Sequence, residues 1–177
     1  MVLSRTNIEE YLGVSAPEIS KERMAASIGS SPESYRFLIE ISFSGKRPLD
    51  WRAAWIADYL AEMQPALPEP HLENILRHMK LTMPGGVMRC YLRMLTRYPI
   101  PEAHQGMIAD LCFESLSRES IPVAVKVHAM EILYRFTQDY PELKNELVIM
   151  LREQMVNNST GFKTRARKII GRLEKEE

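Results

Sequence analysis

The chain has 177 residues, enough for one ordinary domain that buries roughly 70% of the surface its unfolded form would expose. Apolar residues make up 45% and charged residues 26%, which excludes disordered, collagen-like and fibrous classes. Lysine plus arginine (23) balance aspartate plus glutamate (23), so the net charge alone gives no argument for nucleic acid or an anionic membrane as a partner, although local patches can exist.

The N-terminal sequence MVLSRTNIEE lacks the long apolar core and the small-residue cleavage site of a signal peptide. No window approaches the roughly 18 uncharged apolar residues that a membrane-spanning helix needs. We therefore expect a cytoplasmic protein with no membrane contact. A helical fragment near Ile8 to Leu12 and a helical segment from about Glu18 to Ile28 come next, and we expect residues 1–30 to form an N-terminal helical cap.

Helical periodicity continues to the end of the chain, and prolines and glycines interrupt it at intervals that suit short antiparallel helices. The interruption at Ser31-Pro32-Glu33 is typical of a helix start, because serine caps the helix and proline fits its first turn. Apolar residues at helical spacing then mark the first helix of each of four predicted pairs. These residues are Tyr35, Leu38, Ile39 and Phe43; Leu72, Ile75, Leu76 and Met79; Met107, Ile108, Leu111 and Leu116; and Leu143, Leu147, Val148, Leu151 and Met155.

The second helix of each predicted pair repeats three apolar columns. The columns are Trp51, Val87, Val125 and Phe162; then Trp55, Tyr91, Ala129 and Ala166; then Tyr59, Leu95, Leu133 and Ile170. The three columns are four residues apart, so on a helix their side chains lie within an arc of about 80°. Each second helix is therefore predicted to bury one stripe. The two tryptophans and Tyr59 are accordingly expected in the core.

The repeating unit is thus a pair of helices with a period of about 37 residues. A single pair cannot bury its own apolar face, whereas stacked pairs share a continuous core. The sequence therefore predicts an all-α fold, a short right-handed α-solenoid of about four antiparallel helix pairs over residues 31–177, an armadillo-like superhelix. Charged residues on the last helix are expected to face solvent and to cap the end of the stack, which disfavours end-to-end association. We therefore expect a monomer or a weak dimer.

Two of the second helices resemble a known repeat family. Val125 to Leu133 reads VKVHAMEIL and Phe162 to Ile170 reads FKTRARKII. Both resemble the second helix of HEAT repeats, with an apolar residue, a basic residue, a small residue three positions later and then an apolar pair. The first unit keeps the basic residue, Arg52, but has Trp55 at the small position. The resemblance covers roughly residues 31–173 and implies a HEAT-like helical repeat protein.

Motifs that carry chemistry are missing from the sequence. The four histidines, at positions 71, 78, 104 and 128, form no metal-binding pair at i, i+4. Cys90 and Cys112 both lie in apolar helical patterns, where thiols are usually inert. We therefore predict no catalytic residues, no metal, no cofactor and no enzymatic activity.

The strongest signal outside the predicted core is a set of basic columns on the second helices. The segment from Asn74 to Pro101 contains five arginine or lysine residues and no aspartate or glutamate. Second helices line the concave wall of a right-handed solenoid, so arginines ten positions after the first apolar column are expected to form a ladder there. The predicted binding residues are Arg89, Arg93, Arg97, Arg135, Lys168 and Arg172. The alternative is a solvated face whose cations complement helix C-termini and bind nothing.

Two functions remain open. The first is a non-enzymatic adaptor that binds a protein or peptide, acidic ones included, on a concave surface, because arginine binds carboxylates and phosphates in bidentate fashion. The alternative is a nucleic-acid-binding protein resembling the HEAT-like alkylpurine DNA glycosylases, which cradle a duplex with exposed aromatic residues and a carboxylate. Trp51 and Trp55 are predicted to be buried and Asp58 lies at the edge of their stripe, so the first function is favoured.

Overall fold

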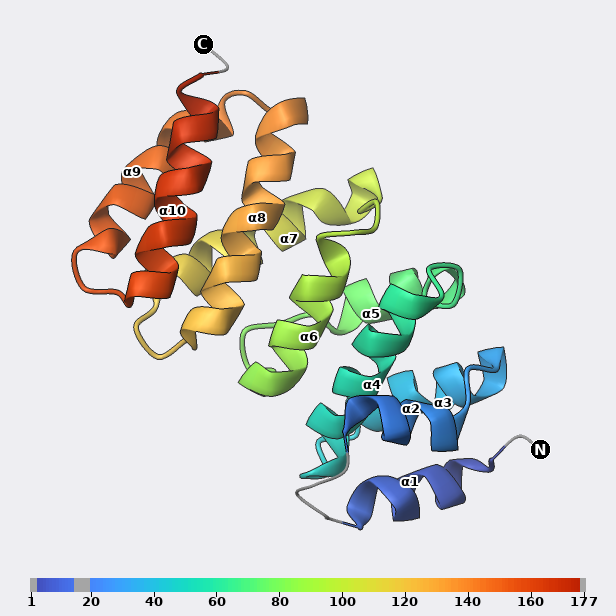
Figure 1. Ribbon diagram of the computed structural model, residues 1–177. Coiled ribbons are helices and arrows are strands. Elements are labelled where there is room, and N and C mark those ends of the chain that lie inside the picture. The colour runs from blue at the N-terminus through green and yellow to red at the C-terminus, as the bar shows by residue number, and fades with distance from the viewer. Residues whose placement is uncertain (1–2, 15–19, 176–177) are drawn as a thin grey trace. The chain divides into compact units, whose positions relative to one another are not determined.

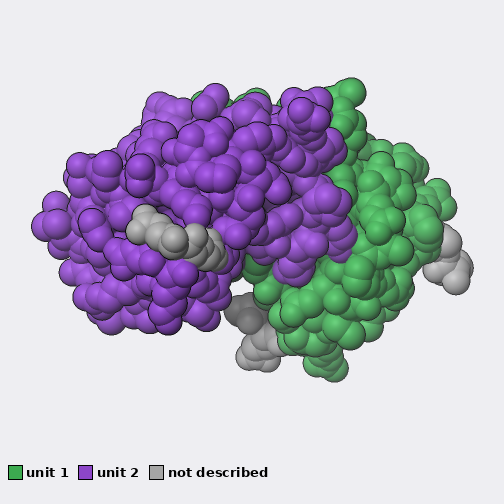
Figure 2. Space-filling model, turned by 90° about the horizontal axis from the view of Figure 1, so that it is seen from above, with its two compact units in different colours: residues 1–94 green, residues 95–177 purple. Residues whose placement is uncertain are grey.

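The computed structural model describes residues 3–14 and 20–175, and all regular secondary structure in these ranges is helical. The predicted all-α class is confirmed for this part of the chain. The predicted helix start at Glu18 lies outside the described residues. The chain divides into two compact units, residues 1–94 (unit 1) and residues 95–177 (unit 2), which are coloured separately in Figure 2.

Unit 1 holds the first six α-helices of the described residues and one 3-10 turn (Figure 1). Its elements are α1 (Arg5–Gly13), α2 (Lys21–Ile28), α3 (Pro32–Ser42), α4 (Leu49–Met63), the 3-10 turn η1 (Glu69–His71), α5 (Leu72–His78) and α6 (Gly85–Leu95), whose last residue belongs to unit 2. Serine caps begin three of these helices. The side chains of Ser4, Ser20 and Ser31 each accept a hydrogen bond from the backbone N–H three residues later.

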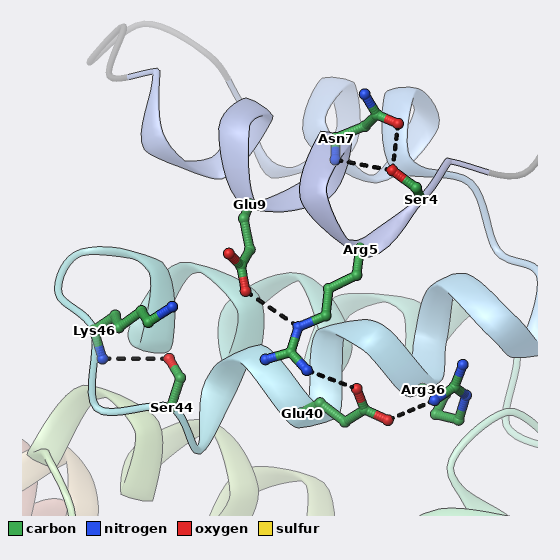
Figure 3. Close-up of polar contacts among 8 residues, drawn as sticks. All are labelled: Ser4, Arg5, Asn7, Glu9, Arg36, Glu40, Ser44 and Lys46. Atoms are coloured by element: carbon green, nitrogen blue, oxygen red, sulfur yellow. Dashed lines mark hydrogen bonds and ion pairs between the residues drawn. The ribbon is translucent and has the colours of Figure 1, made fainter.

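Helix α1 packs against the rest of unit 1 mainly through its apolar side. Ile8 and Leu12 are fully buried, and α1 contacts both α3 and α4. Figure 3 shows the polar contacts around it, in which Arg5 Nη1 lies 3.2 Å from Glu40 Oε2 and Arg36 Nη1 lies 2.6 Å from Glu40 Oε1. Exposed ion pairs of this kind contribute little to stability, so the buried pair of apolar residues supplies most of the attachment.

Helix α6 packs on α3 through a buried tyrosine. The ring of Tyr91 is fully buried and stacks on Phe43 with centroids 5.1 Å apart. Its hydroxyl shares a 2.5 Å hydrogen bond with Ser42 Oγ, which also donates to the Ile39 carbonyl at 2.6 Å. The first turn of α6 approaches α4 closely, because a Cβ on Gly86 would lie only 3.2 Å from Trp51 Cβ. Glycine at this position therefore permits the close approach.

The predicted buried stripe of α4 is wrong. Trp51 is 38% exposed, and Trp55 and Tyr59 are only half-buried. The buried face consists of smaller residues instead, and these are Ala53, Ala54, Ile56, Ala57, Leu60 and Ala61. Alanines bring the backbone of α4 close to its neighbours, and the aromatic residues then lie on the opposite side of the helix.

Unit 2 contains two helix pairs, α7 (Glu102–Ser117) with α8 (Val123–Asp139) and α9 (Leu143–Met155) with α10 (Thr160–Leu173). Short turns join the members of each pair, and the members contact one another. The first helices α7 and α9 also contact each other, and the second helices α8 and α10 lie side by side (Figure 1). This is the two-layer arrangement expected of stacked helix pairs.

The three predicted apolar columns are confirmed in unit 2. Val125, Ala129 and Leu133 on α8 are fully buried, as are Phe162 and Ala166 on α10, and Ile170 follows at 7% exposed. The small alanine in the middle of each stripe lets the two helices approach closely, as packing of ridges into grooves requires. Met107, predicted in the core, is instead 38% exposed, because Ile108 and Leu111 supply the buried face of α7.

The basic residue that follows the apolar position has a structural role in both units. Lys126 is almost fully buried, and its Nζ donates to the Leu116 carbonyl at 3.0 Å and to Gln154 Oε1 at 3.4 Å. Burial lowers the pKa of Lys126. In unit 1, Arg52 Nη1 donates to the Leu12 carbonyl at 2.6 Å. In each case the cation satisfies a carbonyl near the C-terminus of an earlier helix.

Candidate binding surface on α8 and α10

Helix α10 presents a row of cations along one face. Arg165, Lys168 and Arg172 are spaced by three and four residues, so their side chains leave the helix within about 60° of one another. The buried stripe of α10, which includes Phe162 and Ala166, faces α8 and α9 and fixes the direction of this row. The apolar residues of α10 therefore fix how the helix is rotated against its neighbours, and this rotation determines the direction in which the cations point.

A single glutamate on α8 holds two of these arginines. Glu131 Oε2 lies 3.3 Å from Arg165 Nη1, and Glu131 Oε1 lies 3.4 Å from Arg172 Nη1. The guanidinium of Arg172 also lies over the ring of Tyr134, 5.2 Å from its centroid. The arginine side chains remain 42% and 37% exposed, so both guanidinium groups keep a face toward solvent.

Arg135 is a neighbour of this row but is used mainly for structure. Its Nη1 donates to the Leu95 carbonyl at 2.6 Å and its Nη2 to the Tyr98 carbonyl at 3.0 Å. Burial lowers the pKa of Arg135, and the charges of Asp139 and Glu131 oppose that effect. The guanidinium thus supports the chain just after α6 and contributes positive charge rather than a free donor fork.

We define the α8–α10 surface as Glu131, Tyr134, Arg135, Arg165, Lys168 and Arg172. Its four cations and one anion give a formal charge of +3 in a chain whose net charge is zero. Lys168 is exposed, which leaves its ammonium accessible. A surface with two oriented guanidinium groups, an exposed ammonium and an aromatic ring is suited chemically to carboxylate or phosphate groups.

The predicted binding residues of α6 do not belong to such a row. Arg93 Nε lies 2.5 Å from Asp58 Oδ2 and its Nη2 lies 2.7 Å from Glu62 Oε2, so its charge is paired within unit 1. Burial alone would lower the pKa of Arg93, but the hydrogen bonds and charges of these two carboxylates raise it. Arg89 is half-buried, with Nη2 3.8 Å from Cys90 Sγ, and Arg97 is exposed in the turn that follows α6.

Of the six predicted residues, Lys168 and Arg172 lie on one face of α10, and Arg135 lies one helical turn after Glu131 on α8. Arg165, Glu131 and Tyr134 complete the surface and are absent from the prediction. Arg165 could have been predicted from the sequence, because its spacing of three and seven residues from Lys168 and Arg172 places it on the same helix face. The role of Glu131 depends on the pairing of α8 with α10, which spacing along one helix does not reveal.

Unit 1 has an aromatic pair on α4, of which Trp51 is exposed and Trp55 is half-buried. The rings of Trp51 and Trp55 lie with centroids 6.1 Å apart and planes tilted by 39°, and the guanidinium of Arg52 lies 5.6 Å from the Trp51 centroid. An exposed tryptophan beside a cation is a surface on which a planar or apolar group can stack. Asp58, on the same helix, is buried and engaged by Arg93.

Both cysteine thiols are held in an unreactive state. Burial raises the pKa of the Cys90 thiol to about 11 and raises the pKa of the Cys112 thiol still more. Both thiols therefore stay protonated at neutral pH, where they are poor nucleophiles. Within residues 3–14 and 20–175, no group of three or more histidine, cysteine, aspartate or glutamate residues is arranged to hold a metal ion. The same residues include no helix that is both long and apolar enough to span a membrane.

Comparison with known proteins identifies the family. No curated protein and no solved structure matches the chain. A family model described as a HEAT repeat domain matches residues 8–173, which is nearly the whole chain. This match agrees with the paired helices of unit 2, with their small central residues, and with the basic residues that bind carbonyls of earlier helices. The protein belongs to the HEAT repeat domain family.

Proposed function

We propose that the protein is a non-enzymatic binding module, and that the α8–α10 surface holds an acidic segment of a partner protein or peptide. The observation that carries this proposal is the pair of arginines held by one glutamate, with Arg165 and Arg172 each within 3.4 Å of Glu131. Arginines oriented in advance lose less side-chain entropy when they bind a carboxylate. The proposal includes a cytoplasmic monomer or weak dimer with residues 1–30 as a cap on the repeats.

The test is a fluorescence anisotropy titration with labelled peptides. An acidic peptide rich in glutamate is expected to bind at least about tenfold more tightly than a neutral peptide of the same length, because complementary charge favours the former. Its affinity is also expected to fall as salt is added, since the surface charges are exposed. Equal binding of the acidic and neutral peptides would contradict the proposal.

A nucleic-acid-binding role is the second candidate, and one observation supports it. Trp51 is exposed rather than buried, and it lies beside Trp55 and Arg52 on α4. Aromatic and arginine side chains that face solvent can stack on unpaired bases. A labelled short DNA duplex and its separated single strands, titrated beside the peptides, decide between the two functions. Tighter binding of either nucleic acid than of the acidic peptide favours this second role.

A further inference from the structure

Unit 2 has a cleft of about 380 Å³ on the side of α7 and of the turn between α8 and α9. Its apolar surface comes from Phe136 at the end of α8, Ala109 on α7 and Leu143 at the start of α9. Phe136 is only 5% exposed, so it closes the bottom of the cleft. None of the residues of the α8–α10 surface lines this cleft, which is therefore a separate feature of the unit.

One wall of the cleft is fixed by a chain of hydrogen bonds. The Tyr140 hydroxyl donates to Gln105 Oε1 at 2.6 Å, and Gln105 Nε2 donates to the Ile100 carbonyl at 2.9 Å. These bonds hold the Tyr140 ring at the side of an apolar space. The shape is thus largely formed before anything binds, which lowers the entropic cost of binding.

The rim of the cleft is acidic. Glu102, Asp110 and Glu142 line it, all three are exposed, and no lysine, arginine or histidine is among the residues that line it. Within the described part of the chain, none of these three carboxylates forms an ion pair. An apolar space with an aromatic wall and three carboxylates above it complements a side chain that has an aliphatic stem and a cationic end.

Gly106 keeps the middle of the cleft open. It lies inside the 16-residue helix α7, where glycine is less favourable than alanine, and nothing lies within 4 Å of the position that its Cβ would occupy. Packing therefore does not require glycine here. Because Gly106 is one of the residues that line the cleft, we expect a larger residue at this position to take up part of its volume.

We propose that this cleft binds a lysine or arginine side chain of the partner protein. The proposal rests on the protein-binding function given above, but it concerns a different surface and the opposite charge. The partner would then carry a basic residue as well as the acidic segment that the α8–α10 surface holds. The two subsites are independent in their chemistry, so each can fail without the other.

The experiment is a titration of the isotopically labelled protein followed by amide chemical shifts. The first probe is a short peptide whose only charged side chain is a central arginine. The second is the same peptide with norleucine in place of arginine, which keeps the aliphatic stem and removes the charge. We expect the arginine peptide to shift the amides of Gly106, Ala109 and Tyr140 and to bind at least about tenfold more tightly than the norleucine peptide.

Three variants make the test specific. Gly106→Leu is expected to fill the cleft and abolish these shifts without lowering the unfolding midpoint, because nothing lies within 4 Å of the position of the new Cβ and leucine favours a helix more than glycine does. Gly171→Leu, at another helical glycine with nothing within 4 Å, is the matched control and should bind as the wild type does. Glu142→Gln, which changes no volume, is expected to weaken binding severalfold.

Three results would overturn the proposal. These are equal affinity for the arginine and norleucine peptides, unchanged binding by Gly106→Leu, and shifts that lie outside the cleft. Binding of the acidic peptide to the α8–α10 surface is measured in the same samples. Loss of arginine binding alone therefore removes the cleft proposal, and loss of acidic-peptide binding alone removes the proposed function.

Discussion

Replacement of Phe162 by alanine is expected to lower the free energy of unfolding by about 3–5 kcal/mol, whereas Trp51→Ala is expected to lower it by about 1 kcal/mol. Both residues occupy the first apolar column of the repeat. Phe162, in the first turn of α10, is fully buried, so its removal leaves a cavity among well-packed neighbours. Trp51 is 38% exposed, and alanine retains the Cβ that lies 3.2 Å from the position a Cβ would have at Gly86.

Urea denaturation followed by far-ultraviolet circular dichroism measures both losses. Phe162→Leu serves as the control, because it removes less volume and is expected to fall between the wild type and Phe162→Ala. The backbone cap is unaffected in each variant, since the Phe162 N–H bonds to Ser159 Oγ regardless of the side chain. Losses of similar size for Phe162→Ala and Trp51→Ala would contradict the burial pattern described for α4 and α10.

Arg93→Met is expected to destabilise the protein by about 2–3 kcal/mol. The substitution leaves Asp58, which is only 3% exposed, without the guanidinium that lies 2.5 Å from it. Removing an oppositely charged partner from a buried charge costs several kcal/mol, and the partial exposure of Arg93 reduces that cost here. The second pair, with the exposed Glu62, adds little, because solvent screens it.

The double variant Arg93→Met with Asp58→Asn separates charge from packing. Asparagine removes the buried negative charge at nearly the same volume, so the double variant is expected to regain at least about 1 kcal/mol relative to Arg93→Met. Chemical denaturation of the two single variants and the double variant completes the cycle. A double variant less stable than Arg93→Met would show that the ion pair is not the reason for the loss.

The helix pairs of unit 2 could be predicted from the sequence because their buried columns contain bulky apolar residues. Val125 and Phe162 are 37 residues apart, as are Leu133 and Ile170, and all four are buried. Helix α4 differs, because its buried face is made of alanines and its aromatic residues lie outside. Hydrophobicity by residue type therefore selected the wrong face, since alanine is favoured where helices approach most closely.

The candidate site could be predicted only in part, for a related reason. The row of Lys168 and Arg172 follows from spacing along one helix. The partners of Arg93 and Arg135 do not, because they lie on other helices and one set consists of backbone carbonyls. The cleft is lined by residues of α7 together with Phe136 and Tyr140, which are distant in the sequence, so it requires the folded arrangement.

Charge reversal on α10 tests most directly whether the α8–α10 surface of this HEAT repeat protein binds an acidic segment, as we propose. Lys168 belongs to the surface, whereas Arg167, also exposed, leaves the helix about 130° away from the cationic row. Lys168→Glu and Arg167→Glu change the net charge equally. We expect Lys168→Glu to raise the dissociation constant of the acidic peptide at least about tenfold and Arg167→Glu to raise it less than about threefold. Equal effects of the two reversals would contradict the claim.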